Sequence, residues 1–182
     1  MKNEERQITK EPFGHCLNST QCISPDGRYI VYDTRNDDGA LAANGEIRVL
    51  DIETGEDIIV YKTKNQTEYG PGVGAATWSP DGKMLLFLGG IQNANKENPY
   101  SFTRRTGIGI KWGKPNEPIW MDARDMNTPS TPGALRGGTH AHTWSGRDNW
   151  ISFTYNDHLI AEAAKTDNSF SRFANSRSDV SG

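Results

Sequence analysis

Trp78-Ser79-Pro80-Asp81-Gly82-Lys83-Met84-Leu85-Leu86-Phe87 joins a tight turn to an apolar strand, and it indicates the architecture of the chain. An earlier copy is Ile23-Ser24-Pro25-Asp26-Gly27-Arg28-Tyr29-Ile30-Val31-Tyr32, and a degenerate third is Trp144-Ser145-Gly146-Arg147-Asp148-Asn149-Trp150-Ile151-Ser152-Phe153. Proline presets φ for the first central position of a type I turn, and glycine takes the left-handed conformation that opens a bulge. Each copy therefore predicts a β-hairpin.

The segments after the first two hairpins extend each of them into a sheet. Residues 46–51 and 57–61 follow the first hairpin, and residues 107–112 and 118–122 follow the second, behind a polar insert. Only the hairpin is clear in the third copy. Four antiparallel strands per repeat is the pattern of a propeller blade. The sequence therefore predicts an all-β protein, a partial β-propeller of about three blades built from four-stranded antiparallel sheets.

These motifs resemble a known class of repeat. The turn at 78–83 and the strand and turn at 47–56 resemble the WD-like repeat of TolB-type β-propellers. Residues 6–160 are also similar to a bacterial propeller family of unknown function related to TolB, through stretches at 6–9, 32–35, 137–144 and 151–157. The resemblance implies a propeller fold, and it implies no established activity.

The repeat sets the expected boundaries within a partial propeller at 6–160. Blade 1 is expected at about 15–62, blade 2 at about 72–123 and a partial blade 3 at about 137–160. Residues 161–165 suit a short helical turn or a last strand, and the polar tail at 165–182 is expected to be disordered. Because propellers have about 4–8 blades, we expect an N-terminal portion of a longer propeller. Closure by self-association is the alternative.

Composition narrows the class of partner and the compartment. The chain has 182 residues and a formal charge of −3, so a basic face for nucleic acid is not expected. No apolar run reaches the roughly 18 residues of a membrane-spanning helix, and no hydrophobic region follows the N-terminus. A cytoplasmic location is expected, or a periplasmic one if a signal was removed.

Two cysteines lie close together in the sequence. An extended strand would hold the Cα atoms of Cys16 and Cys22 roughly 20 Å apart, against about 5.5 Å in a disulfide. We therefore expect two free thiols.

His140 and His142 form the sharpest candidate site. Residues two apart on a strand share a face about 6.6 Å apart, so both rings could reach one divalent ion such as Mn, Ca or Zn. His15 is the expected third ligand. Aligned on the repeat serines, His142 matches Gln21, which places both on innermost strands beside the central channel. The alternative is that the histidines hydrogen-bond across strands or bind a ligand without a metal.

The histidine pair also resembles one in oligogalacturonate lyases, which are TolB-like propellers that bind a divalent ion through a His-x-His pair. The chain departs from that pattern at Gly137, where such a site would offer a side-chain ligand.

A second set of polar residues follows two equivalent strands. Asp33 and Arg35 come after the first hairpin, and Asn156 and Asp157 come after the third. These residues are expected at one end of the disc, as binding or acid–base groups or as ordinary loop caps.

Three functions fit these observations. The first is a non-catalytic scaffold that binds a protein or a small polar ligand at the channel mouth, around His15, Gln21, His140 and His142. The second is a metal-dependent lyase or hydrolase acting on an acidic sugar. The third is the N-terminal propeller of a larger enzyme, although no Gly-x-Ser-x-Gly nucleophile motif is present.

Overall fold

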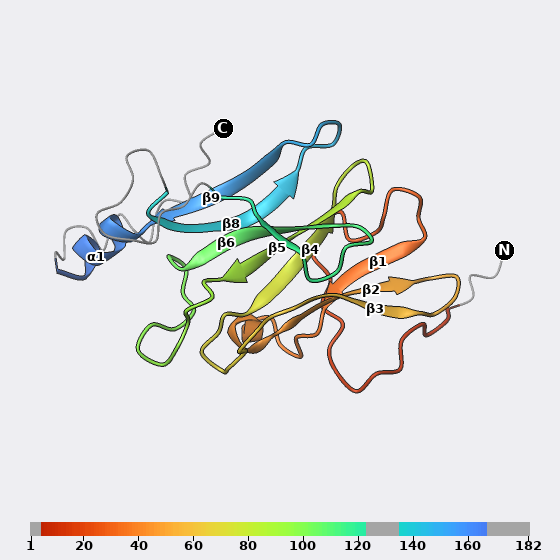
Figure 1. The fold of residues 1–182 in the computed structure, drawn as a ribbon, viewed down its shortest axis with the longest axis horizontal. Coiled ribbons are helices and arrows are strands. Elements are labelled where there is room, and N and C mark those ends of the chain that lie inside the picture. The colour runs from red at the N-terminus through yellow and green to blue at the C-terminus, as the bar shows by residue number, and fades with distance from the viewer. Residues whose placement is uncertain (1–4, 123–134, 167–182) are drawn as a thin grey trace.

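Three antiparallel sheets lie face to face in the structure, a computed structural model that describes residues 5–122 and 135–166 (Figure 1). The first sheet contains β1 (Tyr29–Asp33), β2 (Glu46–Asp51) and β3 (Asp57–Lys62), with the short 3-10 helix η1 (Ala40–Ala43) between β1 and β2. The second contains β4 (Val73–Trp78), β5 (Met84–Gly90), β6 (Arg105–Lys111) and β7 (Pro118–Trp120). The third contains β8 (Gly137–Trp144) and β9 (Ile151–Asp157), and α1 (His158–Thr166) follows it.

The two Ser-Pro-Asp-Gly turns have the same local structure, as predicted. In the second copy the Ser79 hydroxyl donates to the Asp81 carboxylate at 2.7 Å and accepts from the Met84 N–H at 2.9 Å. The first copy repeats both bonds from its own serine. Gly27 and Gly82 adopt φ of 76° and 69°, the left-handed region in which glycine carries no steric cost. A four-residue motif therefore fixes each hairpin locally.

The innermost part of the first sheet differs from the expected fourth strand. Its residues make only two isolated bridges to β1, Cys16 to Asp33 and Ile23 to Ile30. Gln21, which lies between them, has a φ of 54°, and a left-handed residue interrupts the pleat of a strand. The second sheet has all four expected strands in the order β4-β5-β6-β7, and the third sheet is the expected hairpin.

The main hydrophobic core lies between the first and second sheets. Its fully buried members include Val31 and Ile47 from the first sheet and Leu85, Phe87 and Ile108 from the second. The aromatic rings of Tyr61 and Phe87 meet across this interface with centroids 5.1 Å apart. We call this contact the apolar interface. It confirms that consecutive sheets bury their faces against each other, as blades do.

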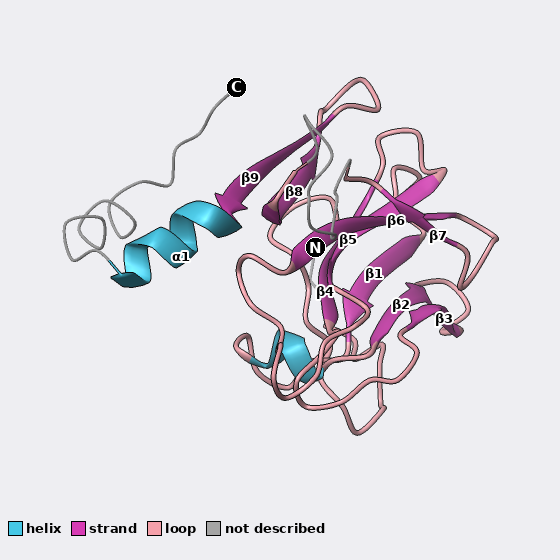
Figure 2. Cartoon of the chain, turned by 60° about the vertical axis from the view of Figure 1, so that its left-hand side comes forward, coloured by secondary structure: helices cyan, strands magenta, loops and turns pink. Residues whose placement is uncertain are grey.

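The third sheet packs on the opposite side of the second, through β8 against β5 and β6. The arrangement is all-β, open and repetitive, which is a partial propeller and not a closed barrel. Figure 2 shows α1 continuing from the end of β9 at the edge of the sheets. The chain is therefore helical over 158–166, so the tail expected to be disordered from residue 165 is helical at its first two positions. Its remaining residues, 167–182, lie outside the described ranges.

Two further expectations concern the cysteines and the membrane. Cys16 and Cys22 are free thiols, as predicted. Among the helices in the described ranges, none has the length and apolar character needed to cross a bilayer.

Candidate functional site

A backbone irregularity recurs in the innermost segment of every sheet. Gln21, Ala75 and Ala141 have φ of 54°, 57° and 54°, although none is glycine. The ladders of β4 with β5 and of β8 with β9 shift register at the same places. Such a bulge redirects the neighbouring side chains. The simple alternation that predicted a shared face for His140 and His142 therefore does not hold across Ala141.

His142 lies in a buried polar cluster between the second and third sheets. Its Nε2 atom is 3.0 Å from the Thr139 hydroxyl and 3.9 Å from the Asp122 carboxylate. That carboxylate also accepts the Thr139 and Thr106 hydroxyls and the Gly107 N–H. We call this contact the polar interface. His142 is therefore engaged in holding two sheets together.

Burial and hydrogen bonding act in opposite directions on Asp122. Burial alone would raise the pKa of this carboxyl, but the nearby His142 and the hydrogen bonds from Thr139 and Thr106 hold its pKa below the usual value. Asp122 is thus an ionised group in the polar interface. Glycine at 107 is required here, because a Cβ atom would stand 2.8 Å from the His142 Nε2.

His140 has a different set of neighbours. Its ring lies edge-on to Phe102, with centroids 6.4 Å apart. The Arg105 guanidinium lies 4.0 Å from the Phe102 ring centroid and 5.0 Å from that of Tyr100. Burial and the nearby Arg105 charge lower the pKa of His140. The polar insert before β6 therefore supplies the aromatic surroundings of this histidine.

Gln21 connects the innermost segment of the first sheet to the third sheet through hydrogen bonds. Its amide oxygen accepts the Trp144 N–H and its amide nitrogen donates to the Trp144 carbonyl, both at 3.3 Å. The Gln21 carbonyl in turn accepts the Trp78 N–H at 2.8 Å. One residue thus links all three innermost segments.

His15 lies away from the other two histidines. Its ring stacks on Phe13 and lies 4.9 Å from the ring of Tyr32. Tyr32 follows the core residue Val31 and so faces the side of the first sheet opposite the apolar interface. The structure therefore does not bring His15, the expected third metal ligand, to His140 and His142. In the ranges 5–122 and 135–166, no three His, Cys, Asp or Glu side chains are grouped to hold a metal ion.

Asp33 and Arg35 form a buried ion pair at the end of β1. The Arg35 Nε atom donates to Asp33 at 2.7 Å, and the Asp33 carboxylate also accepts the N–H of the bulge residue Ala75 at 2.9 Å. Arg35 further donates to the Cys16 sulfur at 3.1 Å. Asp33 thereby connects the first sheet to the innermost strand of the second, and its acid–base capacity is committed to that contact.

Asn156 and Asp157 end β9 at the corresponding position. Asp157 accepts the Ile160 N–H at 3.2 Å, which caps the first turn of α1, and it pairs with Arg136 at 3.3 Å. Asn156 is exposed beside it. These two residues are the last of β9, and Asp157 acts there as a helix cap.

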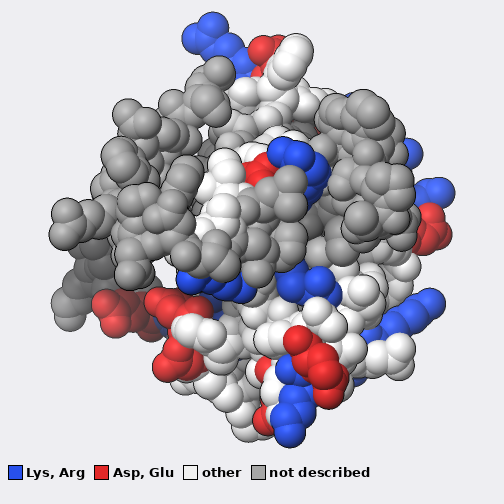
Figure 3. Space-filling view, turned by 90° about the vertical axis from the view of Figure 1, so that its left-hand side faces the viewer, with Lys and Arg blue, Asp and Glu red and all other residues white. Residues whose placement is uncertain are grey.

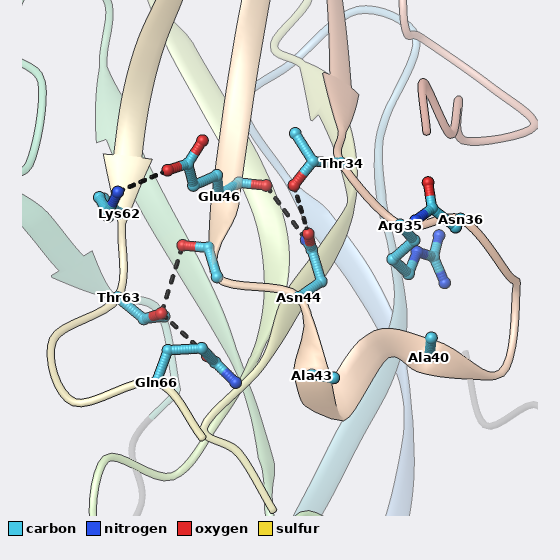
Figure 4. A pocket seen from close by; sticks show the side chains of 11 residues that line it. Thr34, Arg35, Asn36, Ala40, Ala43, Asn44, Glu46, Lys62, Thr63 and Gln66 are labelled. Carbon is cyan, nitrogen blue, oxygen red and sulfur yellow. Dashed lines mark hydrogen bonds and ion pairs between the residues drawn. The ribbon is translucent and has the colours of Figure 1, made fainter. Parts of the chain in front are cut away.

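A cavity of about 410 Å³ opens at the end of the first sheet where β1 ends and β2 begins (Figure 4). We call it the loop-end pocket. It is lined by residues 34–36, by Ala40 and Ala43 of η1, and by residues 44–46, 62–63 and 66. Arg35 is the one predicted site residue in its wall.

Asn44 fixes one side of the loop-end pocket through hydrogen bonds. Asn44 donates to the Val73 carbonyl at 2.6 Å and to the Glu46 carbonyl at 3.1 Å, and it accepts the Thr34 hydroxyl at 2.6 Å. Asn44 is buried, so these bonds fix the pocket against the second sheet. Figure 4 shows Asn44 and Thr34 meeting on one side of the pocket.

A second amide fixes the opposite side. Gln66 accepts the Thr63 hydroxyl at 2.9 Å, and it donates to the Ala42 carbonyl at 2.7 Å. Lys62 reaches across to Glu46 with a 2.7 Å ion pair. Sequence patterns do not single out these residues, because they come from separate loops and carry no motif.

Charged side chains of both signs lie on one face of the molecule. Figure 3 views the side on which α1 lies in Figure 1, and Lys or Arg side chains stand next to Asp or Glu over the visible described surface.

The stacked antiparallel sheets, the repeated hairpin turn and the bulged innermost segments define a partial β-propeller with a pocket at one blade end. The chain belongs to the family described as "Protein of unknown function (DUF3748)", which matches residues 72–177.

Two known proteins are similar to this chain. It is 36% identical over 157 residues to the uncharacterised protein YidR of Escherichia coli (strain K12), covering 86% of this chain and 36% of that protein. The chain therefore spans about a third of that relative's length. The solved structure of a putative TolB from Agrobacterium tumefaciens matches 82% of this chain and 41% of its own chain, with a TM-score of 0.46 and 16% identity.

Proposed function

We propose that this chain is a ligand-binding segment of a propeller, and that the loop-end pocket binds a small polar ligand without catalysing a reaction. The supporting observation is the pocket itself, whose volume of about 410 Å³ lies in the range of small-molecule sites. Its walls are held by hydrogen bonds between different loops, so little ordering is needed on binding.

The alternatives from the sequence have less support in the described residues. His142 and Asp33 are committed to contacts between sheets, and His15 lies on another face. A metal-dependent reaction on an acidic sugar would need ligands that these positions do not bring together. Because the chain spans only part of the YidR length, the proposal concerns this segment, and a role within a larger enzyme is compatible with it.

A blocked pocket tests the proposal. Ala43 lines the pocket and is exposed, so Ala43→Leu should fill the cavity without disturbing the core, whereas Ala43→Ser should leave it open. We expect small polar compounds to raise the melting temperature of the native protein and of Ala43→Ser through binding to the folded state, but not that of Ala43→Leu. Equal shifts in both variants would contradict the proposed site.

Elemental analysis tests the competing metal hypothesis. Stoichiometric Mn, Zn or Ca in the purified protein, lost in His140→Ala, would replace this proposal with metal-dependent chemistry. His140 is the suitable position for this test, because His142 has a structural role in the polar interface.

A further inference from the structure

The hydrogen-bonding groups of the two amides in the loop-end pocket are already occupied. Both N–H groups of Asn44 and both of Gln66 donate to backbone carbonyls, and both side-chain oxygens accept a hydroxyl. An amide offers two donors and one carbonyl oxygen. These side chains therefore shape the pocket, and ligand recognition depends on neighbouring residues that still have hydrogen-bonding groups to offer.

The carboxylate in the wall is also satisfied. Glu46 accepts Lys62 on one oxygen at 2.7 Å and Arg48 on the other at 3.0 Å. Burial alone would raise the pKa of Glu46, but these two hydrogen bonds hold its pKa below the usual value. Because Arg48 alone is sufficient to pair Glu46, Lys62 can turn toward a ligand without leaving a buried charge unpaired.

The pocket groups that can still form hydrogen bonds with a ligand are N–H donors. Lys62 has three N–H groups and uses one on Glu46, and its side chain is 63% exposed. Arg35 has five N–H groups and uses three, on Asp33, Asp38 and Cys16. Figure 4 places Lys62 and Arg35 on opposite sides of the pocket. A ligand would thus meet cationic donors at both ends.

We propose that the loop-end pocket recognises a small carboxylate that carries further oxygen acceptors, an inference that rests on the ligand-binding function proposed above. Hydrogen bonds from a cationic donor to a carboxylate are roughly twice as strong as neutral ones. Lys62 meets the carboxylate, and Arg35 donates to an oxygen at the far end. A dianion is disfavoured, because Asp33 and Glu46 already balance most of the positive charge around the pocket.

Three probes with one sugar scaffold test this inference: glucuronate, neutral glucose and the dianionic glucose 6-phosphate. Backbone amide chemical shifts of the isotope-labelled chain are followed at Gly45, Thr63 and Gln66 up to roughly 10 mM, beyond the millimolar range of a weak complex. We expect glucuronate to bind more tightly than either of the others.

Two lysine variants separate the pocket charge from net charge. Lys62→Met should weaken glucuronate binding about tenfold, the loss of one charge-assisted bond. Lys83→Met removes an exposed lysine from the hairpin turn at the opposite end of the second sheet and should leave binding unchanged. Equal binding of glucose and glucuronate, or no effect of Lys62→Met, would overturn the carboxylate inference and leave the proposed pocket intact. No shift with any probe would overturn both.

Discussion

The apolar interface and the polar interface join the same second sheet to its two neighbours by different means. The apolar interface contains fully buried aliphatic and aromatic side chains from both sheets, among them Val31, Ile47 and Phe87. The polar interface is built around Asp122, Thr139 and His142. Burying an apolar side chain stabilises by roughly 1.5–3 kcal/mol, whereas a buried polar group contributes only when every partner is in place.

The difference shows that sheets built from the same repeat motif can pack against each other through two kinds of contact. The first contact is non-directional and tolerates small movements. The second depends on the ionisation of Asp122 and on the bulge that directs His142 toward it. Stability should therefore be unevenly distributed, with the third sheet attached less firmly than the first.

The largest effect is expected from a matched pair of phenylalanines. Phe87→Ala empties a fully buried position in the apolar interface and should reduce the free energy of unfolding by about 3–5 kcal/mol. Phe153→Ala removes a ring that is 41% exposed on the third sheet and should cost less than about 1 kcal/mol. Urea denaturation measures both. Equal losses would mean that a half-exposed ring of the third sheet contributes as much as a buried ring of the apolar interface, which contradicts the expected unevenness.

Loss of the Asp122 carboxylate should have the next largest effect. Asp122→Ala leaves the Thr139 hydroxyl and the Gly107 N–H without their acceptor and should cost about 2–3 kcal/mol. Asp122→Asn retains an acceptor oxygen and should cost less. A loss below about 0.5 kcal/mol in Asp122→Ala, the range of ordinary surface changes, would remove Asp122 from the contacts that hold the third sheet.

A smaller effect is expected at Gln21. Gln21→Ala removes two side-chain hydrogen bonds to the Trp144 backbone and should cost about 1 kcal/mol. The specific consequence is faster hydrogen exchange of the Trp144 amide, which loses its acceptor. Unchanged protection of that amide would show that Gln21 does not link the first and third sheets.

The smallest effect is a pH dependence. The pKa of Asp122 is lower in the folded state than in the unfolded chain, so its contribution is present above the unfolded value, about pH 4, and is lost as pH falls through the folded value. The stability difference between the native protein and Asp122→Asn should therefore shrink below about pH 4. A difference that is constant with pH would contradict an ionised, hydrogen-bonded Asp122.

The sequence predicts those parts of the fold that are encoded locally. The turns at Gly27 and Gly82 depend on neighbouring residues alone, and both form as expected. The bulges at Ala75 and Ala141 could not be predicted, because alanine rarely adopts a positive φ and packing of the sheets imposes it. The inner edge of the first sheet lacks a regular strand for the same reason, because Gln21 also has a positive φ.

The candidate site was predictable only in part. Arg35 and Gln21 were found because they occupy repeat-equivalent or polar loop positions, and Arg35 does line the pocket. Asn44, Lys62 and Gln66 carry no signal, because their importance arises when three loops converge after folding. His140 and His142 were paired by strand periodicity, and one bulge at Ala141 separates their surroundings.

Native-state hydrogen exchange in low urea tests the unequal attachment of the sheets most directly, because it gives an opening free energy for each strand. We expect β8 and β9 to exchange through an opening of lower free energy than β1, β2, β4, β5 and β6, which share the apolar interface. A single opening free energy common to strands of all three sheets would contradict it.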